Sequence, residues 1–392
     1  MIIKPKIRGF VCTTAHPLGC EVHVQEQIAF VKRQGAIPNG PKKVLIIGSS
    51  TGYGLASRIT AAFGCKADTL GVFFEKEPTN DHTATAGWYN SIAFEKAAKV
   101  ENLYAKSING DAFSDAIKAT TIDILKKEMG PLDLIIYSVA SPRRTHPKTG
   151  EIAKSVLKPI GQPFIGKTLD TDKAEVKNIH IEAATIEEIA DTVKVMGGED
   201  WEMWIDALKK AGLLAKDCKT ISYTYIGAKQ TWPIYGKAAI GKAKEDLDRA
   251  SRAINDKLAH IGGSAYVAVM KAVVTQASSA IPIMPLYISL LFKIMKEKGL
   301  HEGCIEQLYR LFSTELYSEN PLQLDSSGRI RMDDLELQAD VQNEVEALWE
   351  KVDSSNLESL SDFKGYQKEF LRLFGFGFPS IDYEAEVSPI LD

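Results

Sequence analysis

The chain has 392 residues, of which 45% are hydrophobic and 25% are charged. This composition is typical of a soluble globular protein with a substantial core, organised as one large domain or as two. The net charge of −4 gives no electrostatic reason to expect nucleic acid as a partner, although the 47 Lys and Arg residues leave room for a local phosphate-binding patch.

Nothing in the sequence predicts a membrane or secreted protein. The first residues, MIIKPKIRGF, lack the apolar core of a signal peptide. The longest apolar run, 280–295, contains Pro282 and Pro285 and is shorter than the roughly 20 residues that a membrane span needs. Five cysteines without close pairs fit free thiols in a reducing compartment. We therefore expect a cytoplasmic protein.

A cluster near the N-terminus, Cys12, His16, Cys20 and His23, invites interpretation as a metal site. Its spacing lacks the close cysteine pair of common zinc motifs. We therefore expect small buried thiols and loop histidines here, and no metal.

The segment KVLIIGSSTGYGLASR carries the strongest local signal in the chain. An apolar strand, 44–47, runs into Gly48, Gly52 and Gly54, and an Ala-rich helix follows to about Phe63. The glycines permit a tight turn and let the backbone approach a pyrophosphate, whose charge is favoured at a helix N-terminus. This pattern predicts a dinucleotide-binding turn.

A second predicted strand, 69–74, ends in Glu75, where an acid can accept hydrogen bonds from an adenosine ribose. The Glu75 carboxylate would repel a 2′-phosphate, which favours NADH over NADPH. Lys76 could reach such a phosphate if Glu75 turned away. The structural alternative for Glu75 is a solvated strand end.

The alternation of strands and helices continues along the chain. A third strand, 103–108, leads to Asp111, which is placed to contact the edge of an adenine. A helix over 115–128 precedes a fourth strand, 132–139, which ends at Ala140. This spacing predicts a parallel sheet with ligands outside the carboxyl ends of its strands.

The next strand leads into the segment that carries the chemistry, with Tyr225, Tyr235 and Lys244. A Lys charge beside a phenol favours the phenolate, so the phenol becomes a better acid that can protonate an enolate. Tyr235 and Lys244 are nine positions apart and would lie on opposite sides of a continuous helix. We therefore expect Tyr235 in a loop or irregular turn before the helix. Tyr225 with Lys229 is the weaker pairing, and a strand face beside a solvated helix is the structural alternative.

Two stretches lie outside this alternation. The polar segment 143–198 is predicted to be an excursion with short hairpins, and the apolar segment 280–295 is either a substrate lid or core packing. The helix after Glu199 has Trp201, Trp204, Ile205 and Leu208 at core spacing. We expect one Rossmann-type domain over 1–392, with substrate-side excursions near 143–198 and 276–300.

These features in this order resemble the short-chain dehydrogenase/reductase superfamily. Eight residues separate Tyr235 from Lys244, whereas the wider superfamily has its Tyr and Lys one helical turn apart. That spacing, the arm MIIKPKIRGFVCTTAHPLGC and the stretches GWYN (87–90), VKVMGGEDWE (193–202) and HEGCIEQ (301–307) are similar to FabV-type trans-2-enoyl-CoA/enoyl-ACP reductases. The resemblance covers essentially the whole chain.

The resemblance implies a doubly wound Rossmann-type α/β fold with an N-terminal arm and a small substrate-side region. It implies a largely monomeric enzyme that reduces the double bond of trans-2-enoyl thioesters with NADH. Tyr225 would bind substrate, Tyr235 would donate the proton, and Lys244 would bind cofactor and tune Tyr235. The implied cofactor contacts are Gly48, Ser49, Ser50, Thr51, Gly52, Tyr53, Phe74, Glu75, Asp111, Ala112, Val139, Ala140, Lys244, Val273, Val274 and Thr275.

Two other functions use parts of the same pattern. A carbonyl reductase of the superfamily would share the cofactor turn and a Tyr/Lys pair, but the second tyrosine, Tyr225, argues against it. A cofactor-binding regulator would not need Tyr235 and Lys244 beside the nicotinamide.

Overall fold

A seven-stranded parallel sheet forms the centre of the computed structural model, which describes residues 1–391. The strand order is β13-β12-β11-β6-β3-β4-β5, so the direction of winding reverses between β3 and β6. Such a reversal opens a crevice at the carboxyl edge of the sheet, where ligands bind in folds of this type. The strands are β3 (Lys43–Ile47), β4 (Asp68–Phe73), β5 (Ala105–Asn109), β6 (Leu132–Tyr137), β11 (Leu214–Thr224), β12 (Ser264–Val269) and β13 (Ile330–Arg331). The expected doubly wound α/β fold is confirmed.

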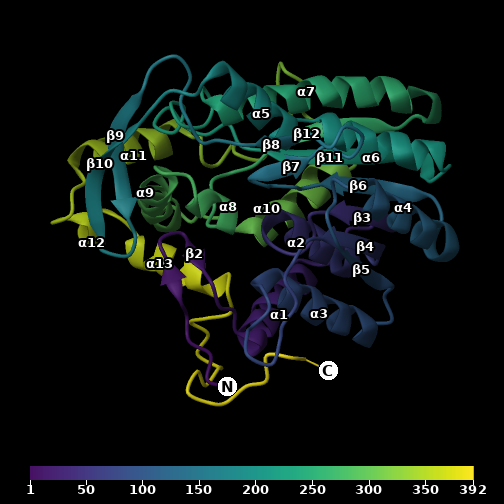
Figure 1. Cartoon of the computed structure of the whole chain (residues 1–392), viewed down its shortest axis with the longest axis horizontal. Coiled ribbons are helices and arrows are strands. Elements are labelled where there is room, and N and C mark those ends of the chain that lie inside the picture. The colour runs from purple at the N-terminus through teal and green to yellow at the C-terminus, as the bar shows by residue number, and fades with distance from the viewer. Residues whose placement is uncertain (392) are drawn as a thin grey trace.

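Helices cover both faces of this sheet (Figure 1). Side chains of a strand alternate between its faces, so Val44 and Ile46 join one core while Leu45 and Ile47 join the other. The first core is completed by α1 (Pro17–Gln34), α2 (Gly52–Ile59), α3 (Ala86–Val100) and α10 (Cys304–Arg310). The second is completed by α4 (Asp115–Ile124), α6 (Glu199–Lys210) and α7 (Ala239–Leu258), with the α6 residues Trp201 and Trp204 fully buried as predicted.

Helix α1 was not anticipated, and it corrects the expectation of loop histidines. His16 is the N-cap, since its Nδ1 accepts a hydrogen bond of 3.3 Å from the amide of Gly19, and His23 lies within the helix. Cys12 and Cys20 are buried free thiols, as expected. Within residues 1–391, no three His, Cys, Asp or Glu side chains gather as metal ligands would.

The apolar stretch 265–274 predicts a strand that is longer than β12, which ends early because side chains replace its ladder partners. The strand ends at Val269, five residues before the expected end. Beyond it, the amide of Lys271 donates to Gln307 Oε1 at 2.8 Å, and the amide of Ala272 donates to Glu336 Oε2 at 2.6 Å. These side-chain acceptors hold the backbone of Lys271 and Ala272 just beyond the end of β12.

A third layer lies beside the sheet, at the left of Figure 1. It consists of α8 (Gln276–Ser279), α9 (Met284–Glu297), α11 (Ala339–Lys351), α12 (Leu357–Leu360), α13 (Phe363–Arg372) and the antiparallel pair β9 (Phe164–Asp170) and β10 (Glu175–Ile181). Helix α9 is buried along most of its length against α11, α13 and β9. The apolar segment is therefore a core helix, which favours the packing alternative over a lid.

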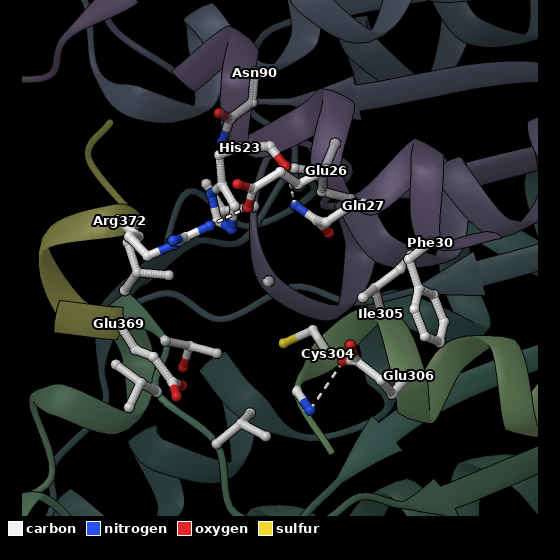
Figure 2. A pocket seen from close by; sticks show the side chains of 18 of the residues that line it. His23, Glu26, Gln27, Phe30, Asn90, Cys304, Ile305, Glu306, Glu369 and Arg372 are labelled. Carbon is white, nitrogen blue, oxygen red and sulfur yellow. Dashed lines mark hydrogen bonds and ion pairs between the residues drawn. The ribbon is translucent and has the colours of Figure 1, made fainter. Parts of the chain in front are cut away.

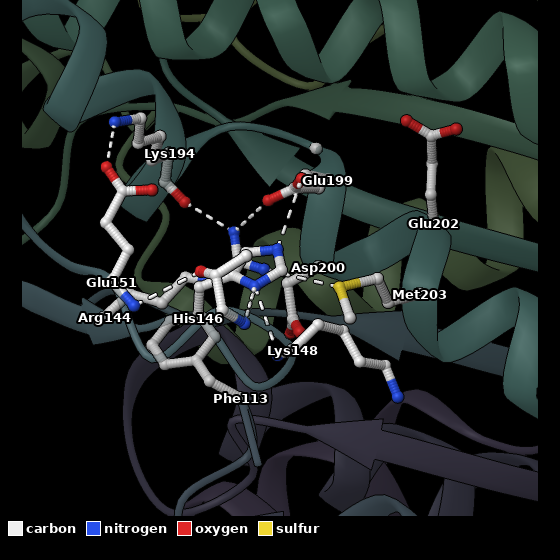
Figure 3. Close-up of polar contacts among 12 residues, drawn as sticks. Phe113, Arg144, His146, Lys148, Glu151, Lys194, Glu199, Asp200, Glu202 and Met203 are labelled. Atoms are coloured by element: carbon white, nitrogen blue, oxygen red, sulfur yellow. Dashed lines mark hydrogen bonds and ion pairs between the residues drawn. The ribbon is translucent and has the colours of Figure 1, made fainter. Parts of the chain in front are cut away.

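The excursion at 143–198 contains the expected hairpins, with β7 (Arg143–Thr145) paired to β8 (Ile152–Lys154), and α5 (Ile186–Met196) beyond them. Polar contacts anchor its root to the start of α6 (Figure 3). Arg144 Nη1 donates to Glu199 Oε2 at 2.6 Å and to the Lys194 carbonyl at 2.7 Å, and its guanidinium lies over the Phe113 ring. The excursion is thereby fixed beside the carboxyl edge of β6.

The remaining elements are short: β1 (Ile7–Arg8), β2 (Val11–Cys12), a 3-10 turn (Ala259–Ile261) and π-helical turns at Thr60–Gly64, Leu125–Met129 and Leu311–Leu316. No helix in the described part of the chain is both long and apolar enough to cross a membrane.

Candidate active site

A cleft of about 830 Å³ lies at the carboxyl ends of β3, β4 and β6. It is lined by Gly48, Ser50–Tyr53, Val72–Glu75, Asp111–Phe113, Ser138–Arg143, Thr145 and Thr275–Ala277. Most of the predicted cofactor residues are among them. Ser49 is an exception, since it is fully buried and its Oγ donates to the Val72 carbonyl at 3.3 Å.

The turn after β3 can only be made by glycine at two positions. Gly48 has φ +89°, and a Cβ there would lie 2.1 Å from the Ser138 carbonyl oxygen. A Cβ on Gly54 would lie 1.8 Å from the Gly48 carbonyl oxygen. The turn therefore packs tightly and delivers the N-terminus of α2, with its unpartnered amides, to the cleft. This geometry fits a pyrophosphate.

Glu75 is held in this cleft by specific contacts. Ser50 Oγ donates to its Oε1 at 2.6 Å, and the Glu75 amide donates to Asn109 Oδ1 at 2.9 Å. Gly87 leaves room for the carboxylate, because a Cβ there would lie 2.0 Å from Oε1. These contacts argue against the solvated strand end, and they suit a carboxylate that accepts hydrogen bonds from a ribose.

A second pocket, of about 450 Å³, opens from the same crevice, since Tyr53, 138–142 and Thr275 line both. Tyr225, Tyr235 and Lys244 line it, so the structure brings the three predicted side chains together. Its other walls are largely apolar and include Leu157, Met196, Ile240, Ile281 and Met284. A cofactor cleft and an apolar pocket with two phenols and an ammonium thus share one wall.

Tyr235 lies in the irregular turn before α7, as predicted, and Lys244 lies on α7. The Tyr225 and Tyr235 rings meet edge to face, with centroids 5.1 Å apart. Burial raises the pKa of Tyr235 and lowers the pKa of Lys244 to about 8. The expected lowering of the Tyr235 pKa by Lys244 is not found, so Tyr235 is a neutral phenol that can donate a hydrogen bond.

Two buried residues at this pocket, Glu336 and Lys271, were not predicted from the sequence. Glu336 is fully buried, and its carboxylate accepts hydrogen bonds from Tyr225 and Tyr287. Lys271 is 1% exposed and lines the pocket. A lone lysine in the apolar run AYVAVMKAVVT was a usable signal for Lys271, whereas the polar stretch around Glu336 offered none.

A third cavity, of about 490 Å³, lies between α1, α10 and α13 (Figure 2), and Thr51, Gly52, Thr275 and Gln276 line both this cavity and the cofactor cleft. Val274 lines this cavity and does not line the other two. Three of its charged groups have partners within the protein: Arg372 pairs with Glu26, and the Glu306 carboxylate accepts from the Gly303 amide at 3.0 Å.

A doubly wound sheet, a glycine turn, an acid at the next strand end and an adjoining Tyr/Lys pocket define a nicotinamide-dinucleotide-dependent oxidoreductase. Residues 82–317 match the family model described as the trans-2-enoyl-CoA reductase catalytic region. Residues 2–80 match the NAD(P)H binding domain of trans-2-enoyl-CoA reductase. The chain belongs to the trans-2-enoyl-CoA reductase family.

Full-length relatives support this assignment. The chain is 65% identical over 389 residues to an enoyl-[acyl-carrier-protein] reductase [NADH] of Saccharophagus degradans, covering 99% of this chain and 98% of the relative. A trans-2-enoyl-CoA reductase of Treponema denticola in complex with NAD superposes with a TM-score of 0.96 at 51% identity, and each chain is fully covered. A Clostridium trans-2-enoyl-CoA reductase in complex with NADH gives a TM-score of 0.96 at 46% identity, covering 99% of this chain and 98% of the other.

Residues 324–387 match a model described as an enoyl reductase FAD binding domain. In this chain, α11 and α13 of the segment bury apolar side chains against α9. Gly375 is packed on α1, where a Cβ would lie 2.4 Å from the His16 carbonyl oxygen. The described residues of this segment thus serve packing and do not fit a flavin dinucleotide, and no step is assigned to a flavin.

Proposed function

We propose that this protein reduces the carbon-carbon double bond of trans-2-enoyl thioesters with NADH, the last reductive step of fatty acid elongation. One observation carries the proposal: the dinucleotide cleft, with Glu75 held inside it, opens directly onto the apolar pocket that contains Tyr235 and Lys244. Relatives named for NADH-dependent enoyl-ACP reduction support it.

Different residues of the cleft would contact different parts of the cofactor. Gly48 and 50–53 would face the phosphates, Phe74 and Glu75 the adenosine, and 111–112 the adenine. Val139 and Ala140 lie where the two pockets meet, where the nicotinamide ribose is expected, and Val273 and Thr275 would border the nicotinamide. When bound, NADH supplies a hydride to the β-carbon of the substrate.

The chain's own residues then manage the charge that develops on the thioester oxygen. The neutral Tyr235 hydroxyl has no hydrogen-bond partner among residues 1–391, so it is available to donate to that oxygen. Such a preorganised donor in a dry pocket stabilises an enolate before the α-carbon takes its proton. Lys244 binds the cofactor beside it, and Tyr225 contacts the substrate. The apolar walls exclude water and accommodate the acyl chain.

The relatives differ in the thioester carrier that their names give, acyl carrier protein in one group and CoA in the other. The pocket described above surrounds the acyl part, so we propose that both carriers present the same group to it. Because every site residue comes from a single chain, the site is complete in a monomer, which we propose as the active form. Five free cysteines are consistent with a cytoplasmic location.

The test follows NADH oxidation by absorbance with crotonyl-CoA and with a longer 2-enoyl-CoA. Tyr235→Phe should lower kcat by about 100-fold or more, the loss expected when one donor to a developing oxyanion is removed, and leave NADH affinity unchanged. Tyr266→Phe, on β12, is the matched control. Equal losses of turnover and NADH binding would make Tyr235 structural. Turnover of a ketone alone would support a carbonyl reductase, and NADH binding without any turnover would support a regulator.

A further inference from the structure

A buried carboxylate stands behind the substrate pocket without touching it. Glu336 follows β13 and has no exposed surface. Its Oε1 accepts from the Tyr287 hydroxyl at 2.7 Å and from the Tyr225 hydroxyl at 3.0 Å, and its Oε2 accepts from the Ala272 amide at 2.6 Å. Burial raises the pKa of Glu336, whereas its three donors and the nearby Lys271 charge act in the opposite direction and favour the ionised form.

The direction of these bonds is fixed by their neighbours. A backbone amide can only donate, so Oε2 must be an acceptor. Gln342 Nε2 donates to the Tyr287 oxygen at 3.2 Å, which directs the Tyr287 hydrogen to Glu336. An ionised carboxylate has no hydrogen to give, so Tyr225 also donates its hydrogen to Glu336. Of the two phenols, Tyr225 lines the substrate pocket and Tyr287 does not.

Three further tyrosines line this pocket, and their hydroxyl groups also form hydrogen bonds within the protein. Tyr53 donates to the Lys271 carbonyl at 2.6 Å, and Tyr137 donates to Asp200 Oδ2 at 3.1 Å. Tyr223 shares a hydrogen bond of 2.7 Å with Ser57. Tyr235 is the pocket tyrosine whose hydroxyl hydrogen has no acceptor within residues 1–391.

We propose that Glu336 is a positioning residue that withholds the Tyr225 hydrogen from the substrate, so that Tyr235 is the tyrosine that donates to the developing enolate. The inference rests on the proposed function and adds a division of labour between its two tyrosines. Tyr225 contacts the substrate through its ring and through a lone pair of its hydroxyl oxygen. Lys271, buried on the same strand extension as Ala272, supplies a compensating positive charge near the carboxylate.

An isosteric substitution, Glu336→Gln, reverses this arrangement. The Ala272 amide requires an acceptor, so the glutamine oxygen takes the Oε2 position and its NH₂ takes the Oε1 position. The NH₂ then donates to the Tyr225 oxygen, and the Tyr225 hydrogen is free to turn toward the substrate. If Glu336 were merely structural, Glu336→Gln would only lower activity. The positioning role predicts instead that Glu336→Gln raises the activity of the Tyr235→Phe variant.

The experiment compares NADH oxidation with crotonyl-CoA by Tyr235→Phe and by Tyr235→Phe/Glu336→Gln. We expect the double variant to be at least about 10-fold more active than the single one, because Tyr225 replaces the missing donor. Adding Tyr225→Phe should abolish that gain. Tyr235→Phe/Tyr287→Phe, which removes a different donor from the same carboxylate, is the matched control and should give no gain. A folded, NADH-binding double variant that is no more active than Tyr235→Phe would overturn the proposal.

A second variant tests the inference even if Glu336→Gln fails to fold. Tyr225→Phe alone removes a hydroxyl whose hydrogen the substrate does not use, so its loss of kcat should reflect only the lost substrate contact and should be at least about 10-fold smaller than the loss in Tyr235→Phe. Equal losses in Tyr225→Phe and Tyr235→Phe would reject the role of Glu336 while leaving the proposed function intact. Absence of turnover in the unmodified enzyme would reject the proposed function itself.

Discussion

The cofactor cleft and the substrate pocket share a wall but are built in different ways. The cleft is formed by backbone at consecutive strand ends, and its tight contacts involve the glycines Gly48 and Gly54 and carbonyl oxygens close to them. The pocket depends on side chains whose pKa burial has shifted, and they come from segments far apart in the sequence. Substitutions should therefore act through shape in the cleft and through charge and hydrogen bonding in the pocket.

Gly54→Val should have the largest effect. Its new Cβ would meet the Gly48 carbonyl oxygen at 1.8 Å, and backbone on both sides cannot yield cheaply. We expect NADH affinity to fall by about 100-fold or more, or folding to fail, since overpacking of this kind costs about 3 kcal/mol. Isothermal titration calorimetry with NADH measures this affinity. Gly150→Ala, at φ +74° with no atom within 4 Å of the new Cβ, is the control, and should cost only about 1 kcal/mol of stability. Normal NADH binding by Gly54→Val would show that the turn can rearrange.

Lys244→Met tests the substrate pocket, where charge, rather than shape, should determine the effect of a substitution. Burial lowers the pKa of Lys244 from 10.5 to about 8, so between pH 8 and pH 10.5 the unfolded chain binds more protons than the folded one. The unmodified apoprotein should therefore gain stability relative to Lys244→Met as the pH rises through this window, by at most about 3 kcal/mol. Urea unfolding at pH 7 and pH 10 measures the difference, with the exposed neighbour Lys242→Met as control.

The same variant should bind NADH more weakly and turn over more slowly, even where its apoprotein is the more stable of the two. A Lys244→Met protein with unchanged NADH affinity would remove Lys244 from the cofactor site. A pH-independent stability difference would show that its ammonium is well solvated.

Glu75→Ser should have the smallest of these effects, because it changes selectivity and leaves the turn intact. Without the carboxylate that Ser50 holds in the cleft, a 2′-phosphate is no longer repelled. The ratio of kcat/KM for NADPH to that for NADH should rise by about 10-fold, or about 1.4 kcal/mol. Glu77→Ser, exposed two residues away, should leave this ratio where it is. An unchanged ratio in Glu75→Ser would place the ribose elsewhere.

The same contrast explains what the sequence could predict. The cleft is encoded locally, since a strand, three glycines and an acid at the next strand end fall within about 30 consecutive residues. The position of Tyr235 in an irregular turn followed from helix geometry alone. Glu336 could not be found this way, because its partners Tyr225, Ala272 and Tyr287 lie 49 to 111 positions away. Helix α1 was missed because its cap is a histidine, although Pro17 at its start, Lys32 and Arg33 in its last turn and Gly35 after its end are usable helix signals.

The hydrogen bond between Tyr225 and Glu336 also has a consequence for biosynthesis. Its two partners are 111 residues apart, and on a ribosome Tyr225 emerges well before Glu336. The glycine turn and the strands β3 to β6 are complete within the first 137 residues and can form early, because chains begin to fold from the N-terminal side during synthesis. A nascent chain should thus acquire the parts of its dinucleotide cleft long before the tyrosine pocket acquires its carboxylate.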